Sequence, residues 1–512
     1  MPRLVWFCVS LALVLPWARA DAQTLTRAQV IAALPALEAM ARHEVDSGAV
    51  PGLAIAVVFD DEVIELKGFG VREAGKPASI DADTVFQLAS MSKPISSTVV
   101  AALVSQGAVS WGSRIADLDP AFALHDPYPT AELTVRDLFN HRSGLPGTAG
   151  DDLEDIGYSR AEILHRLRFA PPSSSFRAGY SYSNFGLTEG ATAAALASGK
   201  PWETVADETL FRPLGMTSTS ARYADFLAHP NRAELHVRIN GTWTALVKRD
   251  PDAQAPAGGD SSTVRDLAQW MRLELANGMF DGKRLIAASA LDETHSPLMA
   301  RGANPVTGGA SFYGLGWNVE FGRHGLSWGH AGAFSVGART LVTLYPKANL
   351  GIVVLTNAFS TGAPEGLADS FSDLVFDGHV QQDWVKGWDA AYDSLFTPAI
   401  AAAKAAYGAP PSPATPALAS RSYAGRYANA YVGDAVVTNE GGALTLKVGP
   451  NGARSYALRH FDRDLFLDFP DAETPDKPSL VSFAVGPDGK AAAITIESLD
   501  ANGLGTLKRV GD

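Results

Sequence analysis

The stretch Ser90-Met91-Ser92-Lys93 decides how the rest of this chain is interpreted. It precedes apolar residues at helical spacing, Ile95, Val99 and Leu103, so Ser90 is predicted to lie near the start of a buried helix. A spacing of three places Lys93 one turn further along the same helix face, within reach of the Ser90 hydroxyl. The N-terminus of a helix also stabilises negative charge that develops nearby. Serine and lysine in this arrangement can act as a nucleophile and its base.

The tetrapeptide by itself has a plainer interpretation, in which Ser90 only caps the helix and Lys93 is solvated. Two further motifs favour catalysis: Tyr182-Ser183-Asn184 in a glycine-flanked segment, and His330-Ala331-Gly332 followed by Ala333. Acyl transfer requires a base for the hydroxyl, backbone donors for the oxyanion and a proton for the leaving group. The three motifs together supply all of these.

In this order, the motifs resemble those of the serine D,D-peptidase and class C β-lactamase superfamily, which are Ser-x-x-Lys, Tyr-x-Asn, and Lys-Thr-Gly or His-x-Gly. The superfamily includes penicillin-binding proteins, D-aminopeptidases and family VIII esterases. Other stretches that resemble it are Leu133 to Pro146, Pro213 to Met216, Gly258-Gly259 and Tyr313 to Trp317. The resemblance implies an α+β fold, with an antiparallel sheet flanked by helices and a helical insertion.

The spacing of apolar residues along the chain agrees with that fold. A helix is expected over residues 28–43, followed by a hairpin of strands over 53–59 and 63–70 that turns at Asp60-Asp61. Further strand patterns occur at 325–328, 338–344 and 351–355. The sheet is therefore expected to draw on both ends of this region, with the helical segments inserted between them.

The resemblance and the chemistry together assign the site residues. The catalytic group is Ser90, Lys93 and Tyr182, in which either Lys93 or Tyr182 can be the general base. Lys93 must be buried for this role, because its pKa has to fall from about 10.4 to near 7.

Four further residues are expected to bind substrate and stabilise the oxyanion: Asn184, His330, Gly332 and Ala333. The Asn184 amide would donate to the substrate carbonyl while its oxygen holds Lys93. The resemblance implies that the backbone N–H groups of Ser90 and Ala333 form the oxyanion hole.

His330 stands where β-lactamases generally have lysine, a difference that D,D-peptidases and D-aminopeptidases share. This substitution argues against efficient β-lactam hydrolysis. With an ordinary pKa near 6.5, His330 would be largely neutral at pH 7.5 and charged towards pH 6. We therefore expect any dependence on a substrate carboxylate to strengthen as the pH falls.

The C-terminal part is predicted to be a separate small β-domain. Residues 407–419 contain four prolines and no charge, as in a semi-extended linker. Residues 420–512 contain about eight short strand patterns separated by turn signals, which indicates a small β-barrel or sandwich. The segment resembles the lipocalin-like β-domain that is fused to related hydrolases, either as a packing or lid element or as a substrate or partner module.

Residues 1–22 resemble a secretory signal peptide, with Arg3, an apolar run over 4–15 and small residues before the cleavage point. The catalytic domain would then span residues 23–406. The run is too short to cross a membrane, which takes about 20 apolar residues. We expect a secreted or periplasmic protein with no membrane span after signal cleavage.

Composition excludes several classes of protein. The 512 residues carry a formal net charge of -13, which disfavours nucleic-acid binding. The single cysteine, Cys8, lies in the leader, so thiol chemistry is excluded from the mature protein. The 11 histidines show no metal-ligand spacing, so neither a metal nor another cofactor is expected.

The sequence thus predicts an exported serine hydrolase that forms an acyl-enzyme at Ser90. Its expected substrates are small peptides or amides, above all peptides that contain D-residues. A carboxylesterase or a weak β-lactamase on the same fold is the near alternative, with an ester as the substrate in the first case. A catalytically inactive binding protein is the alternative from another class, and the three intact motifs argue against it.

Overall fold

Strand β1 (Gly52–Phe59) is buried along its whole length and explains the layering of the N-terminal body. Its odd-numbered apolar residues pack with α1 (Arg27–Asp46) and α13 (Ala363–Asp377). Its even-numbered residues pack in a second core, with α2 (Ser92–Ser105) and α11 (Val264–Leu275). Since successive side chains of a strand point to opposite faces, β1 must lie inside a sheet with helices on both sides.

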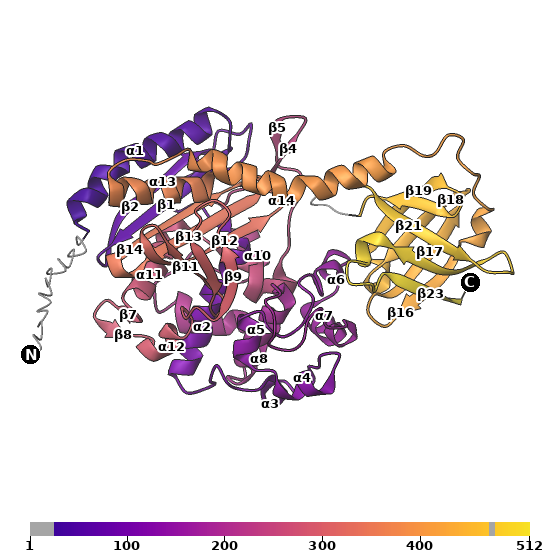
Figure 1. Cartoon of the computed structure of the whole chain (residues 1–512), viewed down its shortest axis with the longest axis horizontal. Coiled ribbons are helices and arrows are strands. Elements are labelled where there is room, and N and C mark those ends of the chain that lie inside the picture. Colours follow the sequence, from indigo (N-terminus) through magenta and orange to yellow (C-terminus); the bar gives the residue numbers. More distant parts are fainter. Residues whose placement is uncertain (1–24, 471–476, 512) are drawn as a thin grey trace, which may run out of the picture.

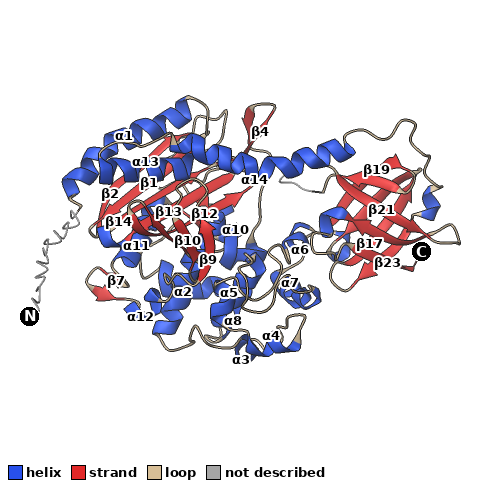
Figure 2. Cartoon of the chain, viewed as in Figure 1, coloured by secondary structure: helices blue, strands red, loops and turns tan. Residues whose placement is uncertain are grey.

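The computed structural model describes residues 25–470 and 477–511 (Figure 1). The expected signal peptide, residues 1–22, lies outside the described residues. A body of helices and sheet and a β-barrel stand at opposite ends of the described chain, bridged by helix α14 (Trp384–Tyr407), as Figure 2 shows by element type. No helix among the described residues has both the length and the apolar character needed to cross a membrane.

The main sheet has eight strands in the order β2-β1-β14-β13-β12-β11-β10-β9. Their bounds are β2 (Glu62–Gly70), β14 (Leu350–Thr356), β13 (Ala338–Tyr345), β12 (Gly325–Phe334), β11 (Asn318–Gly322), β10 (Ala310–Tyr313) and β9 (Met299–Ala303). All neighbouring pairs are antiparallel, and β1 pairs with β14 from the far end of the region. The predicted α+β class is confirmed.

Helices fill most of the chain between β2 and β9 and cover one side of the sheet (Figure 1). They are α3 (Ile115–Leu118), α4 (Pro127–Glu132), α5 (Val135–Phe139), α6 (Asp151–Asp155), α7 (Arg160–Arg166), α8 (Asn184–Leu196), α9 (Trp202–Ala206), α10 (Tyr223–Ala228) and α12 (Ala288–Asp292). Short strands accompany them: β3 (Phe86–Gln87), β4 (His236–Ile239), β5 (Thr242–Thr244), β6 (Ser261–Ser262), β7 (Met279–Phe280) and β8 (Lys283–Arg284), with β15 (Ala358–Phe359) after the main sheet.

The C-terminal strands close into an eight-stranded barrel, as the sequence predicts. They are β16 (Gly425–Asn429), β17 (Gly433–Glu440), β18 (Ala443–Val448), β19 (Arg454–Asp462), β20 (Leu465–Asp468), β21 (Ser479–Val485), β22 (Ala491–Ile496) and β23 (Thr506–Gly511). Strand β16 pairs with β23, so the barrel has no open edge. In the segment expected to be a linker, α14 continues to Tyr407 and residues 408–419 form no helix or strand.

Candidate active site

Ser90 lies on a tight turn between a short strand and a long helix. Strand β3 ends at Gln87, residues 89–91 form a 3-10 turn, and α2 begins at Ser92. Ala89, which precedes the serine, has φ +49°, a conformation that non-glycine residues rarely adopt. Such strain persists where surrounding structure holds it, commonly at functional sites. The turn presents Ser90 beside the N-terminus of α2.

Lys93 is completely buried, as its expected role requires. Its Nζ lies 3.1 Å from Oγ of Ser90, 2.7 Å from Oδ1 of Asn184 and 2.8 Å from the carbonyl oxygen of Ala257. Burial lowers the pKa of Lys93 to about 7, and the nearby charge of Asp151 opposes this fall. A substantial fraction of this lysine is therefore neutral at physiological pH.

Tyr182 approaches the same two residues from the loop before α8. Nζ of Lys93 lies 4.6 Å from the centre of its ring, and its hydroxyl is hydrogen-bonded to Ser90. Burial raises the pKa of the Tyr182 hydroxyl well above 10, and the bond to Ser90 offsets only part of that rise. Tyr182 is therefore a phenol rather than a phenolate at neutral pH.

Asn184 is the first residue of α8, which Ser183 caps through a bond to the Gly186 N–H. Its oxygen accepts from Lys93, as expected, but its Nδ2 donates to the carboxylate of Asp151 across 3.2 and 3.3 Å. The amide is therefore engaged by the protein, which differs from its expected role as a donor to the substrate carbonyl.

Asp151 is a member of the site that sequence reasoning missed. Burial raises its pKa to about 7, helped by the charge of Glu154 and opposed by the Asn184 bond and by Lys93. It lies 33 residues before Asn184 in the chain. No motif surrounds it, and only the fold brings it to Asn184.

Strand β12 forms the other wall of the site and carries His330, Gly332 and Ala333. A Cβ atom at Gly332 would lie 2.1 Å from the carbonyl oxygen of Leu88 and 2.4 Å from Oγ1 of Thr340. Only glycine therefore allows β12 to approach the turn that bears Ser90. The pairing of β11 with β12 ends at Gly329, so no strand among the described residues pairs with residues 330–334 on that side.

His330 is buried and its two ring nitrogens are both engaged. Nδ1 lies 2.6 Å from the carbonyl oxygen of Ala331, which can only accept, so Nδ1 carries the hydrogen. Nε2 then accepts from the Tyr313 hydroxyl at 3.0 Å. Burial, followed by the charge of Lys93, lowers the pKa of His330 to about 3. The expectation of an ordinary pKa and a charge near pH 6 is therefore wrong for this environment.

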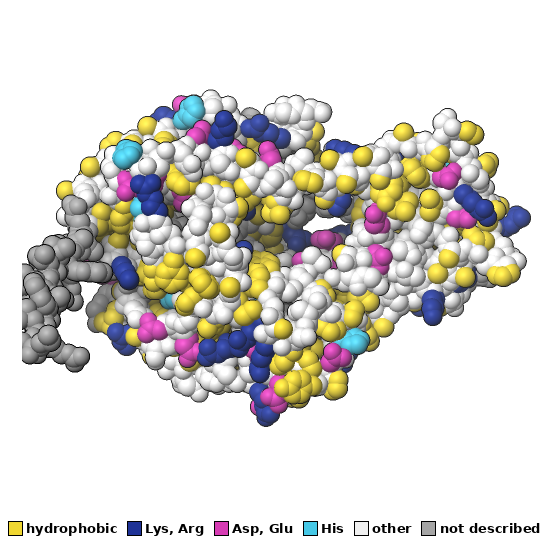
Figure 3. All heavy atoms as spheres, viewed as in Figure 1, with side chains coloured by type: hydrophobic (Ala, Val, Ile, Leu, Met, Phe, Trp, Pro, Cys, Tyr) yellow, Lys and Arg dark blue, Asp and Glu magenta, His cyan; other side chains and the backbone are white. Residues whose placement is uncertain are grey.

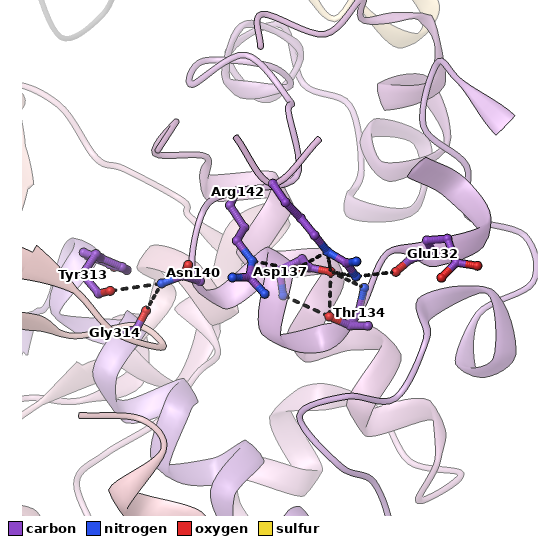
Figure 4. Close-up of polar contacts among 8 residues, drawn as sticks. Glu132, Thr134, Asp137, Asn140, Arg142, Tyr313 and Gly314 are labelled. Atoms are coloured by element: carbon purple, nitrogen blue, oxygen red, sulfur yellow. Dashed lines mark hydrogen bonds and ion pairs between the residues drawn. The ribbon is translucent and has the colours of Figure 1, made fainter. Parts of the chain in front are cut away.

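An ionic network surrounds the buried carboxylate of Asp137 (Figure 4). The buried Asp137 accepts from Arg142 at 2.7 Å, from Arg177 at 2.7 Å and from Thr134 at 2.7 Å. Burial by itself would raise the pKa of Asp137, but these bonds lower it overall. Arg177 lies five residues before Tyr182, so the network holds the start of its loop.

His141 connects this network to the site. Its ring centre lies 4.6 Å from that of Tyr182, and its Nδ1 accepts from the Ser183 N–H at 3.1 Å. Asn140 donates to the carbonyl oxygens of Tyr313 and Gly314, as Figure 4 also shows. His141 therefore packs directly against a candidate catalytic residue.

A cavity of about 680 Å³ opens at the site. Ser90, Tyr182, His330 and Ala333 line it, together with residues of α13 and α14 on the outer side of the sheet. The structure therefore brings these sequence-predicted residues to one hollow, where Lys93 contacts Ser90 and Asn184 contacts Lys93.

A histidine and two acids meet at another point of the same cavity, which His324 and Asp373 also line. Possible ligand atoms of His324, Asp373 and Asp377 lie within 4.8 Å of one another. Nε2 of His324 is 3.0 Å from Asp377, to which Arg323 also pairs at 3.0 Å. These ion pairs tie the turn between β11 and β12 to α13, and none of the Ser90 group takes part.

The fold and this group of side chains are those of the penicillin-binding and β-lactamase type of serine hydrolase. The family model for β-lactamases matches residues 37–374, so the chain belongs to the β-lactamase family. A model for a domain of unknown function, DUF3471, matches residues 409–505, which contain most of the barrel.

Curated relatives are similar over most of the catalytic body. Penicillin-binding protein 4 of Amycolatopsis lactamdurans is 27% identical over 346 residues, which cover 64% of this chain and 84% of the relative. Unguisins hydrolase ungD' of Aspergillus campestris is 25% identical, covering 75% of this chain and 74% of its own. D-alanyl-D-alanine-carboxypeptidase/endopeptidase AmpH of Escherichia coli is 26% identical, covering 64% and 85%.

Solved structures match nearly the whole chain. The octameric penicillin-binding protein homologue from Pyrococcus abyssi has a TM-score of 0.57 at 16% identity, covering 91% of this chain and 98% of its own. A crystal structure of SurE has a TM-score of 0.55 at 22% identity, covering 94% and 99%. At these identities the likeness concerns the fold alone.

Proposed function

We propose that this protein is an exported serine hydrolase that forms an acyl-enzyme at Ser90 and cleaves amide bonds in peptides. The hydrogen-bond partners of Lys93 carry the proposal. A neutral amine has two hydrogens and one lone pair, and two of its three partners, the oxygens of Asn184 and Ala257, can only accept. The lone pair is then left for the third partner, the hydroxyl of Ser90 at 3.1 Å.

In the proposed reaction, neutral Lys93 accepts the Ser90 proton as Oγ attacks the substrate carbonyl carbon. The pKa values favour Lys93 over Tyr182 as this base, because the pKa of Lys93 is about 7 while that of Tyr182 is raised above 10. The backbone N–H groups of Ser90 and Ala333 would stabilise the oxyanion. Tyr182, bonded to Ser90, would pass its own proton to the departing amine and regain a proton from Lys93, which returns to its neutral form. Neutral Lys93 would then take a proton from water as the water oxygen attacks the acyl carbon, and that proton would return to Oγ of Ser90 as the ester bond breaks.

The open edge of β12 at residues 330–334 supports a peptide substrate, because an extended backbone can pair there as an added strand. The relatives whose names denote a D-alanyl-D-alanine carboxypeptidase and a hydrolase of unguisins support peptides with D-residues. Neutral His330 would act through hydrogen bonding and architecture. Arg301, which also lines the cavity, is the cation we assign to a substrate carboxylate.

A carboxylesterase remains the alternative on the same residues, because an activated ester needs less help at the leaving group. A weak β-lactamase would use the same acylation step. Comparing second-order rate constants for a D-alanyl-D-alanine peptide, a nitrophenyl ester and a cephalosporin ranks the three activities. The peptidase assignment would be overturned if the enzyme favoured the ester over the peptide by more than the ratio of their uncatalysed hydrolysis rates.

Export is supported only by the sequence of residues 1–22. The test is to express the full chain in a Gram-negative host and determine the N-terminus of periplasmic material by mass spectrometry. A mature chain that starts near residue 23 is expected. Retention of Met1 in a cytoplasmic protein would overturn the proposal.

Intact-mass labelling tests the acyl-enzyme. A fluorophosphonate is expected to add one label to the wild type, on Ser90, and none to Ser90→Ala. Lys93→Arg, whose guanidinium stays charged, should lose at least about 10³-fold in labelling rate. Ser92→Ala, which changes the neighbouring serine, is the matched control for nonspecific labelling. Undiminished labelling of Ser90→Ala would exclude the assigned nucleophile.

A further inference from the structure

The barrel contacts the catalytic body through a buried tyrosine in the turn between β16 and β17. Tyr431 is 1% exposed. Its hydroxyl accepts from the N–H of Gly150 at 2.9 Å and donates to Oδ1 of Asp152 at 2.7 Å. One hydroxyl group therefore joins the residues on either side of Asp151.

From Asp151 the hydrogen bonds continue to the nucleophile. The Asp151 carboxylate accepts from Nδ2 of Asn184, whose oxygen accepts from Lys93, which contacts Ser90. The link from Tyr431 to Asp151 runs through the backbone of Gly150 and Asp152, and each later link is a hydrogen bond between side chains. The path begins in the barrel and ends at the proposed nucleophile.

We propose that the C-terminal barrel positions the proposed base Lys93, by holding Asp151 against Asn184 through the hydroxyl of Tyr431. The inference rests on the proposed function, since it assigns Tyr431 and Asp151 as positioning residues for that reaction. It also gives the barrel a role in acylation, without any substrate contact.

The backbone at Gly150 is tightly packed, so a shift of Tyr431 is passed on to Asp151. Gly150 has φ +94°, and a Cβ atom there would lie 2.8 Å from atoms of both Ile163 and Phe185. The backbone is thus pressed against the body on one side and tied to Tyr431 on the other. Asp151 follows directly, so a shift of this backbone changes the Asp151 to Asn184 geometry.

The charges near Asp151 decide in which direction the pKa of Lys93 changes when Asp151 moves. Asp152, Glu154 and Lys93 act on it electrostatically, and Glu154 is itself paired with Arg249 at 2.6 Å. The negative charge of Asp151 raises the pKa of Lys93. If Asp151 moves away, the Lys93 pKa should fall, while Asn184 loses the bond that orients it.

The test compares Tyr431→Phe with Tyr158→Phe in the full-length protein. Tyr158 donates to the carbonyl oxygen of Val432 at 2.9 Å. Tyr158→Phe therefore removes a buried hydroxyl from the same interface, but one that takes no part in the hydrogen bonds leading to Lys93. The measurement is the rate of fluorophosphonate acylation of Ser90 as a function of pH. Tyr431→Phe should slow acylation at pH 8 by about threefold to tenfold and move the acid limb to lower pH, whereas Tyr158→Phe should stay within about twofold without a pH shift.

A double-mutant cycle identifies the route. In an Asp151→Asn background, Tyr431→Phe should change the rate by less than about twofold, because its effect passes through Asp151. Asp152→Ala, which removes the acceptor on the catalytic side, should also slow acylation at pH 8 and serves as a second variant if Tyr431→Phe does not fold. Only this rate is compared with that of Tyr431→Phe, because Asp152→Ala also removes a charge that acts on Asp151.

Equal effects of Tyr431→Phe and Tyr158→Phe, or an undiminished effect of Tyr431→Phe in the Asp151→Asn background, would overturn the inference. An Asp152→Ala acylation rate at pH 8 identical to that of the wild type would do the same. Failure of the proposed function gives a different result, in which the wild type itself takes no label on Ser90.

Discussion

Nζ of Lys93 lies 2.7 Å from Oδ1 of Asn184, a contact between residues 91 positions apart in the chain. It joins the first turn of α2 to the first residue of α8 and draws both helix starts towards Ser90. Figure 3 shows the face of the molecule with the catalytic body and the barrel side by side. The predictions below all depend on how tertiary contacts set the protonation and placement of this group.

The pKa of Lys93 predicts the acid limb of the activity profile. Since this pKa is about 7, kcat/KM should fall by about tenfold per pH unit below it, as the proposed base becomes protonated. The ionised form of Asp151 raises the Lys93 pKa, so Asp151→Asn, which removes that form, should move the limb to lower pH. The measurement is kcat/KM from pH 4.5 to 9 for both proteins. A limb that stays in place in Asp151→Asn would count against Lys93 as the titrating base.

Tyr182→Phe should separate substrates by their leaving groups. The proposed proton transfer to a departing amine is needed for amides, so kcat for a peptide should fall by about 10²-fold to 10⁴-fold. A nitrophenolate leaves without a proton, so the nitrophenyl ester should lose far less. Parallel steady-state assays on the two substrates provide the comparison. Equal losses on both would indicate that Tyr182 serves the attack on the carbonyl instead.

Because His330 is neutral, the preference of the enzyme for substrates with a free carboxylate should not depend on pH. With the pKa of His330 lowered to about 3, the ratio of kcat/KM for a free-acid peptide and its amide should be flat from pH 5.5 to 8.5. His330→Lys should add a preference for the free acid, because lysine brings a charge to β12. A ratio that rises towards pH 6 in the wild type would restore the carboxylate-reading role expected from the sequence.

Gly332→Ala should disrupt the site more than the fold. The added Cβ would lie 2.1 Å from the carbonyl oxygen of Leu88, so β12 must move away from the turn that bears Ser90. We expect acylation to slow by at least about 10²-fold, as on loss of an oxyanion donor. Gly322→Ala is the control, since its Cβ would approach only a Glu320 carboxylate atom, at 3.7 Å. Circular dichroism checks that both variants fold, and wild-type labelling of Gly332→Ala would refute the prediction.

Asp137→Asn should destabilise the protein at neutral pH. The variant loses the charge with which Arg142 and Arg177 pair. Because these side chains are 24% and 39% exposed and stay partly solvated, the cost in the free energy of unfolding is about 1 to 3 kcal/mol. Because the folded pKa of Asp137 lies below its usual 3.8, its stabilisation is present above that value and is lost as the pH falls below it. Urea unfolding at pH 7 and pH 3 should therefore show a smaller difference between variant and wild type at the lower pH.

The local pattern of the sequence determined the elements and the identity of the main site residues. The apolar spacing after Ser90 predicts α2, the short apolar run over residues 53–59 predicts β1, and turn signals after residue 420 predict the barrel strands. These properties depend on periods of two and 3.6 residues, which can be seen in any short window. The three motifs likewise named Ser90, Lys93 and Tyr182, which the fold brings together.

Only the tertiary structure decided the charges and the remaining partners. The pKa values of Lys93 and His330 both depend on burial by segments distant in sequence, and the same burial that yields a neutral lysine also keeps the histidine uncharged. Asp151 and Tyr431 belong to no motif, because their roles arise from the docking of a loop and a barrel turn. Desolvation and contacts across the chain are properties of the packed molecule, and no local window of sequence contains them.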